Sequence, residues 1–121
     1  FLGAKIVVVF GAGGNRDKTK RPKMGKIAEI YAQKIYITSD NPRNERAEDI
    51  IDEILGGITN KEKVIVEANR KNAIISALKD LQSDEILLIL GKGDETYQII
   101  GDKKIPFDDR QIVREFYATT H

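Results

Sequence analysis

Short β-branched or leucine-rich runs alternate with helical patterns along this chain of 121 residues, and the alternation restricts the fold more than any other feature. The first run, Lys5–Phe10, is almost continuously apolar, which is typical of a strand buried on both faces of a sheet. The other three runs lie at residues 35–38, 64–66 and 86–90. Helical patterns separate the runs, at residues 22–33, at residues 47–55 and after a capping residue at Asn69. This order indicates a Rossmann-like α/β fold, with a mostly parallel sheet and helices on both of its faces.

The end of the chain departs from this alternation. Residues 97–100 and 104–107 flank a glycine turn and predict a C-terminal β-hairpin, which we expect to add an antiparallel edge to the sheet. Asp108 or Asp109 is placed to cap a final helix at residues 110–117. Since no linker composition interrupts the chain, we expect residues 1–121 to form one domain.

The composition narrows the functional classes. Lysine and arginine together number 20 and aspartate and glutamate 19, so charge gives no reason to expect a nucleic acid or an anionic membrane as partner. The chain has no cysteine, which leaves no disulfide framework and no thiolate metal site and fits a reducing cytoplasm. No apolar run approaches the roughly 18 residues of a transmembrane span, and no signal-peptide pattern is visible. The first residue is Phe1 rather than Met, which we interpret as the mark of a piece of a longer protein.

The parallel order predicts where the polar loops meet. In a parallel sheet the strands end at one edge, where open α/β sheets bind their ligands. The loops at residues 11–20, 39–45 and 91–95 each follow a strand, so we expect them to converge. Carboxylates, cations and glycine backbone together suit a small zwitterion or a phosphorylated ligand. The polar residues of the three loops are Arg16, Asp17, Lys18, Lys20, Arg21, Asp40, Asn41, Arg43, Lys92, Asp94 and Glu95.

The middle loop, residues 39–43, carries the strongest ligand-binding signal of the three. Pro42 fixes its own φ and biases Asn41 away from the helical conformation. Arg43 offers a planar fork of donors that suits a carboxylate or a phosphate. The same residues are also compatible with an ordinary strand-to-helix turn in which Asp40 or Asn41 is a cap.

Other chemistries find less support in the sequence. The glycine turn at residues 11–14 begins like a dinucleotide-binding fingerprint, but Arg16 stands in the place of its last glycine, and no P-loop pattern occurs in the chain. A stand-alone nucleotide-binding module is therefore the weaker alternative. The one histidine, His121, lies at the terminus, and there is no Ser-His-Asp, Cys-His or metal-ligand cluster. We expect neither a catalytic residue nor a metal site in this chain.

Four spaced motifs occur along the chain: GAGGNRDKTKRP at residues 11–22, SDNPR at 39–43, GKGDE with YQ at 91–98, and FDD at 107–109. Together they resemble the C-terminal domain of the Mur ligases, of the type that adds diaminopimelate during peptidoglycan synthesis. The resemblance covers essentially the whole chain. One departure is Asp94, where the family usually has a histidine; it puts in doubt any role of that side chain but not of the neighbouring Glu95.

The resemblance implies a ligase of three domains, of which this chain is the last. The N-terminal UDP-sugar domain and the central ATPase domain would be absent from the chain. ATP and Mg²⁺, bound mainly by the central domain, would phosphorylate the glutamate side chain of UDP-N-acetylmuramoyl-L-alanyl-D-glutamate. The amino group of meso-diaminopimelate, held by this domain, would then attack the acyl phosphate. We expect a cytoplasmic monomer, inactive as an isolated domain.

The resemblance also implies how the distal end of diaminopimelate is held. Arg43 would pair with the distal carboxylate, and Asn41 would add amide hydrogen bonds. Glu95, with the carbonyl of Gly91, would hold the distal ammonium. A lysine in this site would leave Arg43 without a carboxylate in a partly desolvated pocket, which disfavours the lysine-adding relative as the alternative.

The remaining implied contacts lie nearer the glycine turn. Arg16 would hold another carboxylate of the amino acid, and Asp40 would fix the loop or an arginine. Lys18 and Lys20 are candidates for contacts to phosphate when the domains close.

Overall fold

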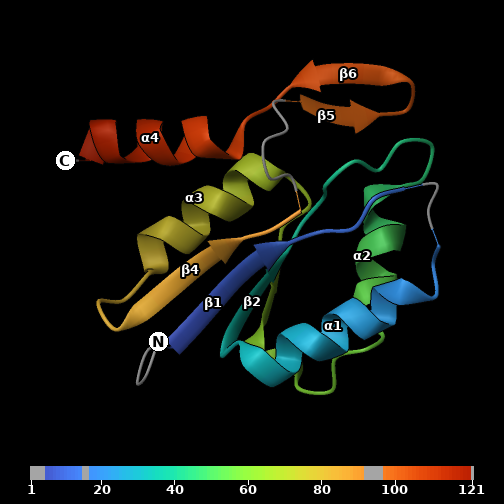
Figure 1. Cartoon of the computed structure of the whole chain (residues 1–121), viewed down its shortest axis with the longest axis horizontal. Coiled ribbons are helices and arrows are strands. Elements are labelled where there is room, and N and C mark those ends of the chain that lie inside the picture. Colours follow the sequence, from blue (N-terminus) through green and yellow to red (C-terminus); the bar gives the residue numbers. More distant parts are fainter. Residues whose placement is uncertain (1–4, 15–16, 92–96, 121) are drawn as a thin grey trace.

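Four parallel strands form the central sheet, in the order β3-β2-β1-β4 (Figure 1). The computed structural model describes residues 5–14, 17–91 and 97–120. The strands of the sheet are β1 (Lys5–Phe10), β2 (Lys34–Ile37), β3 (Val64–Val66) and β4 (Glu85–Ile89). The helices are α1 (Lys20–Tyr31), α2 (Ala47–Leu55), the short 3-10 helix η1 (Lys61–Lys63), α3 (Arg70–Asp80) and α4 (Asp109–Thr120). The predicted α/β fold with a parallel sheet is confirmed.

Helices cover both faces of the sheet. Along β1, Val8 and Phe10 pack in one core cluster with residues of α2, whereas Val7 and Val9 pack in a second cluster with residues of α3. Figure 1 shows α1 and α2 on one side of the sheet and α3 on the other. None of these four side chains is more than 5% exposed, so burial on both faces explains the continuous apolar run, as predicted.

Local sequence signals place the helix starts to within two residues. α3 begins after Asn69, whose side chain accepts a hydrogen bond from the backbone N–H three residues later at 3.0 Å. α1 begins at Lys20, two residues before the predicted start, so Pro22 lies in the first turn, where its missing N–H is not needed. Asp108 precedes α4 and accepts a hydrogen bond from the backbone N–H of Arg110 at 3.0 Å. Among the described residues, no helix is long and apolar enough to cross a membrane.

The predicted β-hairpin is present, but it forms a sheet of its own. β5 (Tyr97–Ile100) and β6 (Lys103–Pro106) pair with each other in antiparallel register, and the expectation that they add an edge to the main sheet is wrong. Figure 1 shows the hairpin beyond the carboxyl ends of the parallel strands. One isolated parallel bridge joins Ile100 of the hairpin to Arg43. The hairpin therefore pairs with the loop that follows β2, not with an edge strand.

A buried arginine, Arg70, ties this end of the sheet to α4. Its Nε and Nη2 donate hydrogen bonds to the two carboxylate oxygens of Asp109, each at 2.8 Å. Its Nη1 donates to the carbonyl of Ser39 at 3.2 Å, and its Nη2 also donates to the carbonyl of Leu90 at 3.0 Å. Arg70 is 1% exposed, so a charged pair is removed from water with an acceptor for each guanidinium nitrogen.

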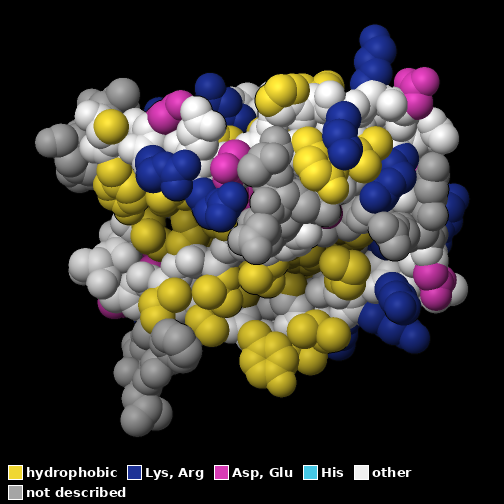
Figure 2. All heavy atoms as spheres, turned by 45° about the horizontal axis from the view of Figure 1, so that its top comes forward, with side chains coloured by type: hydrophobic (Ala, Val, Ile, Leu, Met, Phe, Trp, Pro, Cys, Tyr) yellow, Lys and Arg dark blue, Asp and Glu magenta, His cyan; other side chains and the backbone are white. Residues whose placement is uncertain are grey.

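Apolar side chains also reach the surface between α1 and β4. Ile27 and Tyr31 of α1 are exposed, as are Leu88 and Leu90, and the four line a pocket of about 300 Å³. Figure 2 shows hydrophobic side chains gathered in a band on one face of the molecule. Leu88 pairs with Val8 across the sheet, so it points to the side of α1, where β4 is the edge strand. The α1 side of β4 is thus open to solvent.

Replacing Arg70 with methionine is expected to lower the free energy of unfolding by roughly 3–5 kcal/mol, because the Asp109 carboxylate is left buried without its cation. Urea unfolding followed by circular dichroism measures the loss. The control is Arg110→Met, since the Arg110 side chain is 51% exposed and its pair with Asp108 is expected to contribute about 1 kcal/mol or less. Equal losses in the two variants would contradict the role assigned to Arg70.

Candidate functional site

The three polar loops meet at the carboxyl edge of the sheet, as their order predicts. The backbone N–H of Gly14 donates to the carbonyl of Asn41 at 2.7 Å, which joins the loop after β1 to the loop after β2. Gly91, after β4, lies against the second loop: a Cβ placed on it would be 3.5 Å from Oδ2 of Asp40. The predicted convergence therefore holds for the described parts of all three loops.

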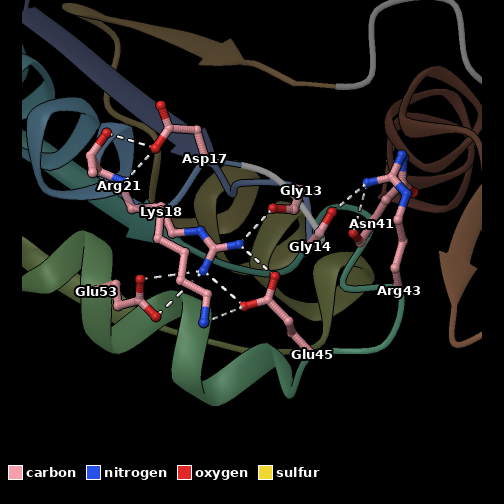
Figure 3. A network of polar contacts seen from close by, with 10 residues as sticks. Gly13, Gly14, Asp17, Lys18, Arg21, Asn41, Arg43, Glu45 and Glu53 are labelled. Atoms are coloured by element: carbon pink, nitrogen blue, oxygen red, sulfur yellow. Dashed lines mark hydrogen bonds and ion pairs between the residues drawn. The ribbon is translucent and has the colours of Figure 1, made fainter.

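Arg21 holds the glycine turn and is not available to a ligand. Nη1 and Nη2 donate to the carboxylate of Glu45 at 3.0 and 2.8 Å, and Nη2 also donates to the carbonyl of Gly13 at 2.9 Å (Figure 3). Glu53 accepts a further hydrogen bond from Nη1 at 3.3 Å. The hydrogen bonds to Glu45 raise the pKa of Arg21 above its usual value. Arg21 is among the polar residues expected to face a ligand. The structure instead places it between two carboxylates, one from α2 and one from the loop before it, so its role is structural.

Arg43 is held in place by its backbone and by one of its side-chain nitrogens. Its N–H donates to the carbonyl of Ile99 at 3.1 Å, and its carbonyl accepts from the N–H of Gly101 at 2.5 Å. Nη1 donates to the carbonyls of Gly14 at 3.1 Å and Asn41 at 3.3 Å (Figure 3). Nε and Nη2 donate no hydrogen bond to any described residue. Among the described residues, one edge of the guanidinium fork thus has no acceptor, and an edge of this kind suits a carboxylate or a phosphate.

The backbone of Arg43 is in the left-handed region, with φ of +54°. This conformation costs a residue with a Cβ about 1–2 kcal/mol, so it persists where surrounding contacts fix it. The turn is not a helix cap: Arg46 precedes α2 and makes no side-chain capping bond. The capping role considered for Asp40 and Asn41 is therefore wrong, since Arg46 is the residue that precedes α2 and both residues lie further from the helix.

The other two residues of the middle loop face different neighbours. Asn41 is buried, and its Oδ1 accepts a hydrogen bond from the N–H of Ile99 in the hairpin at 2.9 Å. Asp40 is 9% exposed and faces Gly91. Asp40 therefore points toward the loop after β4, whereas the oxygen of the Asn41 amide is used to hold β5.

A pocket of about 460 Å³ opens between the first and third loops. Its lining residues are Gly11, Ala12, Gly13, Asp17, Lys20, Arg21, Met24, Asp40 and Gly91. Of the predicted site residues, Asp40, Gly91 and Lys20 therefore share one cavity. Lys18 lies outside it, with its Nζ 3.6 Å from Oε1 of Glu45.

The remaining predicted residues are not gathered in this pocket. Arg43 and Asn41 do not line it and contact the glycine turn at Gly14 instead. Arg16 and Glu95 lie outside the residues that the structure describes, as do Lys92 and Asp94.

Two residues that shape this edge were not predicted from the sequence. Arg70 follows the capping residue of α3, where a charged residue normally faces solvent. Gln98 is 8% exposed and donates hydrogen bonds to the middle loop, although the sequence suggested only that it belongs to a strand. The YQ pair within a spaced motif was the signal that could have indicated a role for Gln98.

Comparison with known proteins decides the family. A family model described as Mur ligase, glutamate ligase domain, matches residues 1–93. This chain belongs to the Mur ligase family.

Similar proteins extend the match over nearly the whole chain. The UDP-N-acetylmuramoyl-L-alanyl-D-glutamate--2,6-diaminopimelate ligase of Helicobacter hepaticus is 63% identical over 119 residues, 98% of this chain. The ligase of the same name from Aquifex aeolicus is 54% identical over 111 residues, 92% of this chain. A solved structure of a ligase with this name superposes with a TM-score of 0.90 at 37% identity over 97% of the chain. This Mur ligase chain spans 26%, 23% and 24% of the lengths of these three proteins, about a quarter.

Replacing Gly14 with alanine is expected to force the first two loops of this Mur ligase chain apart. A Cβ on Gly14 would lie 1.7 Å from the carbonyl oxygen of Pro42, and the obstacle is backbone. Overpacking of this kind typically costs about 1–3 kcal/mol, which thermal unfolding measures. The control is Gly56→Ala, where the nearest atom is 3.3 Å away and φ is −58°. A Gly14→Ala variant as stable as Gly56→Ala would show that the two loops are not packed together.

Proposed function

We propose that this Mur ligase chain holds meso-diaminopimelate within a longer enzyme that joins it to UDP-N-acetylmuramoyl-L-alanyl-D-glutamate. The names of the similar ligases support both substrates. The UDP-sugar and ATPase functions are assigned to parts of the enzyme outside this chain, which is about a quarter of the length of those relatives. ATP and Mg²⁺ are bound mainly there, and the full-length enzyme acts as a monomer in the cytoplasm.

The observation that carries the proposal is the half-engaged guanidinium of Arg43. Its Nη1 is tied to the carbonyls of Gly14 and Asn41, while Nε and Nη2 donate to no described residue. A carboxylate fits such an edge with two parallel hydrogen bonds. Diaminopimelate carries a carboxylate at its distal end, and lysine does not, so this contact distinguishes the two amino acids.

The other predicted site residues complete the proposed contacts. Asp40 and Gly91 line one cavity, and in this proposal the carbonyl of Gly91 acts with Glu95 to hold the distal ammonium. Arg16 binds a second carboxylate of the amino acid. Asn41 supports the loop, because its side-chain oxygen accepts a hydrogen bond from the backbone N–H of Ile99 in the hairpin.

The two lysines of the first loop are proposed to contact phosphate. Lys20 lines the pocket. Lys18 is 63% exposed in an ion pair with Glu45, and such surface pairs contribute about 1 kcal/mol or less, so an incoming phosphate competes with Glu45 at little cost.

The proposed contribution to catalysis is positioning. The amine of diaminopimelate attacks the carbonyl carbon of the acyl phosphate, and the bond from that carbon to the phosphate oxygen breaks. Phosphate is the leaving group, and the nitrogen loses a proton as the amide forms. Holding an amine at the correct distance and angle supplies about 7–11 kcal/mol of the barrier in well-oriented reactions. This chain needs no covalent nucleophile for that task, in line with the absence of such an arrangement from its sequence.

A full-length enzyme that carries this domain is expected to release phosphate only when diaminopimelate is present. The assay contains ATP, Mg²⁺ and the UDP-muramoyl dipeptide, and compares meso-diaminopimelate, L-lysine and no amino acid. Lysine leaves the Arg43 edge unpaired, so its turnover is expected to be much slower. Equal turnover with lysine would mean that the distal carboxylate is not recognised, and turnover with neither would contradict the proposed substrate.

Replacing Arg43 with alanine in the full-length enzyme is expected to lower kcat/KM for diaminopimelate by about 30-fold or more. This corresponds to about 2 kcal/mol or more for a lost charge-assisted contact. The matched control is Arg46→Ala, since Arg46 is exposed and lies three residues further on. Circular dichroism verifies that both variants are folded. Wild-type kcat/KM in Arg43→Ala would exclude the assigned contact.

A further inference from the structure

The hairpin is attached to the molecule through the middle loop. β5 has β6 as its only strand partner among the described residues, and neither joins the main sheet. Instead, β5 donates and accepts hydrogen bonds along residues 39–43, the segment that presents Arg43. We propose that the hairpin sets the position of this loop and that Gln98 is the positioning residue through which it does so.

Gln98 makes two short hydrogen bonds to the loop from a buried position. Its Nε2 donates to Oγ of Ser39 at 2.7 Å and to the carbonyl of Asp40 at 2.6 Å. Gln98 is 8% exposed and Ser39 9%, so water cannot readily replace the amide. The two hydrogen bonds fix the side chain of Ser39, at the start of the loop, and the backbone of Asp40.

Backbone contacts continue the attachment toward Arg43. The N–H of Ile99 donates to Oδ1 of Asn41 at 2.9 Å, and the carbonyl of Ile99 accepts from the N–H of Arg43 at 3.1 Å. The N–H of Gly101 donates to the carbonyl of Arg43 at 2.5 Å. Residues 98–101 thus contact four of the five loop residues, and Pro42, which has no N–H, is held from the other side by Gly14.

The left-handed backbone of Arg43 explains why this attachment matters. With φ of +54°, Arg43 relaxes to another conformation unless contacts on both sides of it are kept. A relaxed loop points the guanidinium elsewhere, and a displacement of about 1 Å can change a rate about 100-fold. Gln98 does not touch the proposed amino acid. Its effect on binding therefore depends on Arg43 and, through it, on the proposed function.

The test compares Gln98→Met with Gln111→Met in the full-length enzyme. Methionine keeps the length of glutamine and removes its donors. Gln111 is an exposed residue of α4 whose amide donates to Glu115 at 2.9 Å, so the same change there lies away from the loop. Gln98→Met is expected to raise KM for diaminopimelate roughly 10- to 100-fold with a smaller change in kcat. Gln111→Met is expected to leave both unchanged.

A double-mutant cycle with Arg43→Ala separates positioning from general destabilisation. If Gln98 acts through Arg43, adding Gln98→Met to Arg43→Ala changes kcat/KM by less than about threefold, because the contact it positions is already gone. Independent, multiplying effects of the two substitutions would overturn the inference. An unchanged KM in the folded Gln98→Met single variant would do the same.

Hydrogen exchange tests the same inference without a substrate. In the enzyme free of amino acid, Gln98→Met is expected to speed amide exchange in residues 39–45, and Gln111→Met is not. Gln98→Met could speed exchange in this loop while the wild-type enzyme shows no turnover with diaminopimelate. That combination would leave the positioning role in place and refute the proposed function. Unchanged exchange would overturn the positioning role. If Gln98→Met does not fold, Ser39→Ala removes one of the two Gln98 bonds and is expected to give a smaller change in the same direction.

Discussion

The pair formed by Arg70 and Asp109 is the interaction on which the carboxyl edge of this domain depends. Four donor–acceptor contacts from one guanidinium join the start of α3 to the loop after β2, to the residue after β4 and to the start of α4. Removing two charges from water is costly, and the pair is tolerated because the fork geometry leaves no guanidinium nitrogen without an acceptor. As a consequence, the loops that follow β2 and β4 leave the sheet at positions fixed by the hydrogen bonds from Arg70 to Ser39 and Leu90.

Two further arginines donate hydrogen bonds to consecutive carbonyls of the glycine turn, and they differ in the acceptors that the rest of each guanidinium contacts. Arg21 donates to Gly13 and to two carboxylates through Nη1 and Nη2 and is 1% exposed, so it stabilises the turn and is not accessible to a ligand. Arg43 donates to Gly14 through a single nitrogen. Both side chains carry the same charge and lie near the same turn. Their different roles follow from which acceptors the fold brings to each: Glu45, in the loop before α2, and Glu53, in the last turn of α2, both lie against Arg21.

The sequence predicts those parts of the structure that follow from local patterns and chain topology. Alternating runs indicate the parallel sheet, and parallel order alone brings three loops together, because strands in such a sheet end at one edge. The placement of the hairpin could not be predicted from the sequence. Its two strands pair with each other, so the hairpin needs no edge of the main sheet. Its docking depends on contacts between residues 58 and 59 positions apart, through Gln98 and Asn41. Likewise, no local pattern distinguishes Arg21 from Arg43, because the carboxylates that accept hydrogen bonds from Arg21 lie 24 and 32 positions away.

In the function that we propose, the site has no covalent catalytic group and works by the accuracy with which it holds its ligand. In this domain accuracy at Arg43 cannot come from a regular element, because the residue lies in a loop and its backbone is in an unfavourable region. It comes from contacts on two sides, with the glycine turn against Pro42 and the strand β5 against the rest of the loop. Gly14 suits the first contact because a side chain would collide with the loop, and Gln98 suits the second because a buried amide can donate to two acceptors at once. In the proposed site, the residues that affect how the ligand is held therefore include Gly14 and Gln98, to which we assign no contact with the ligand.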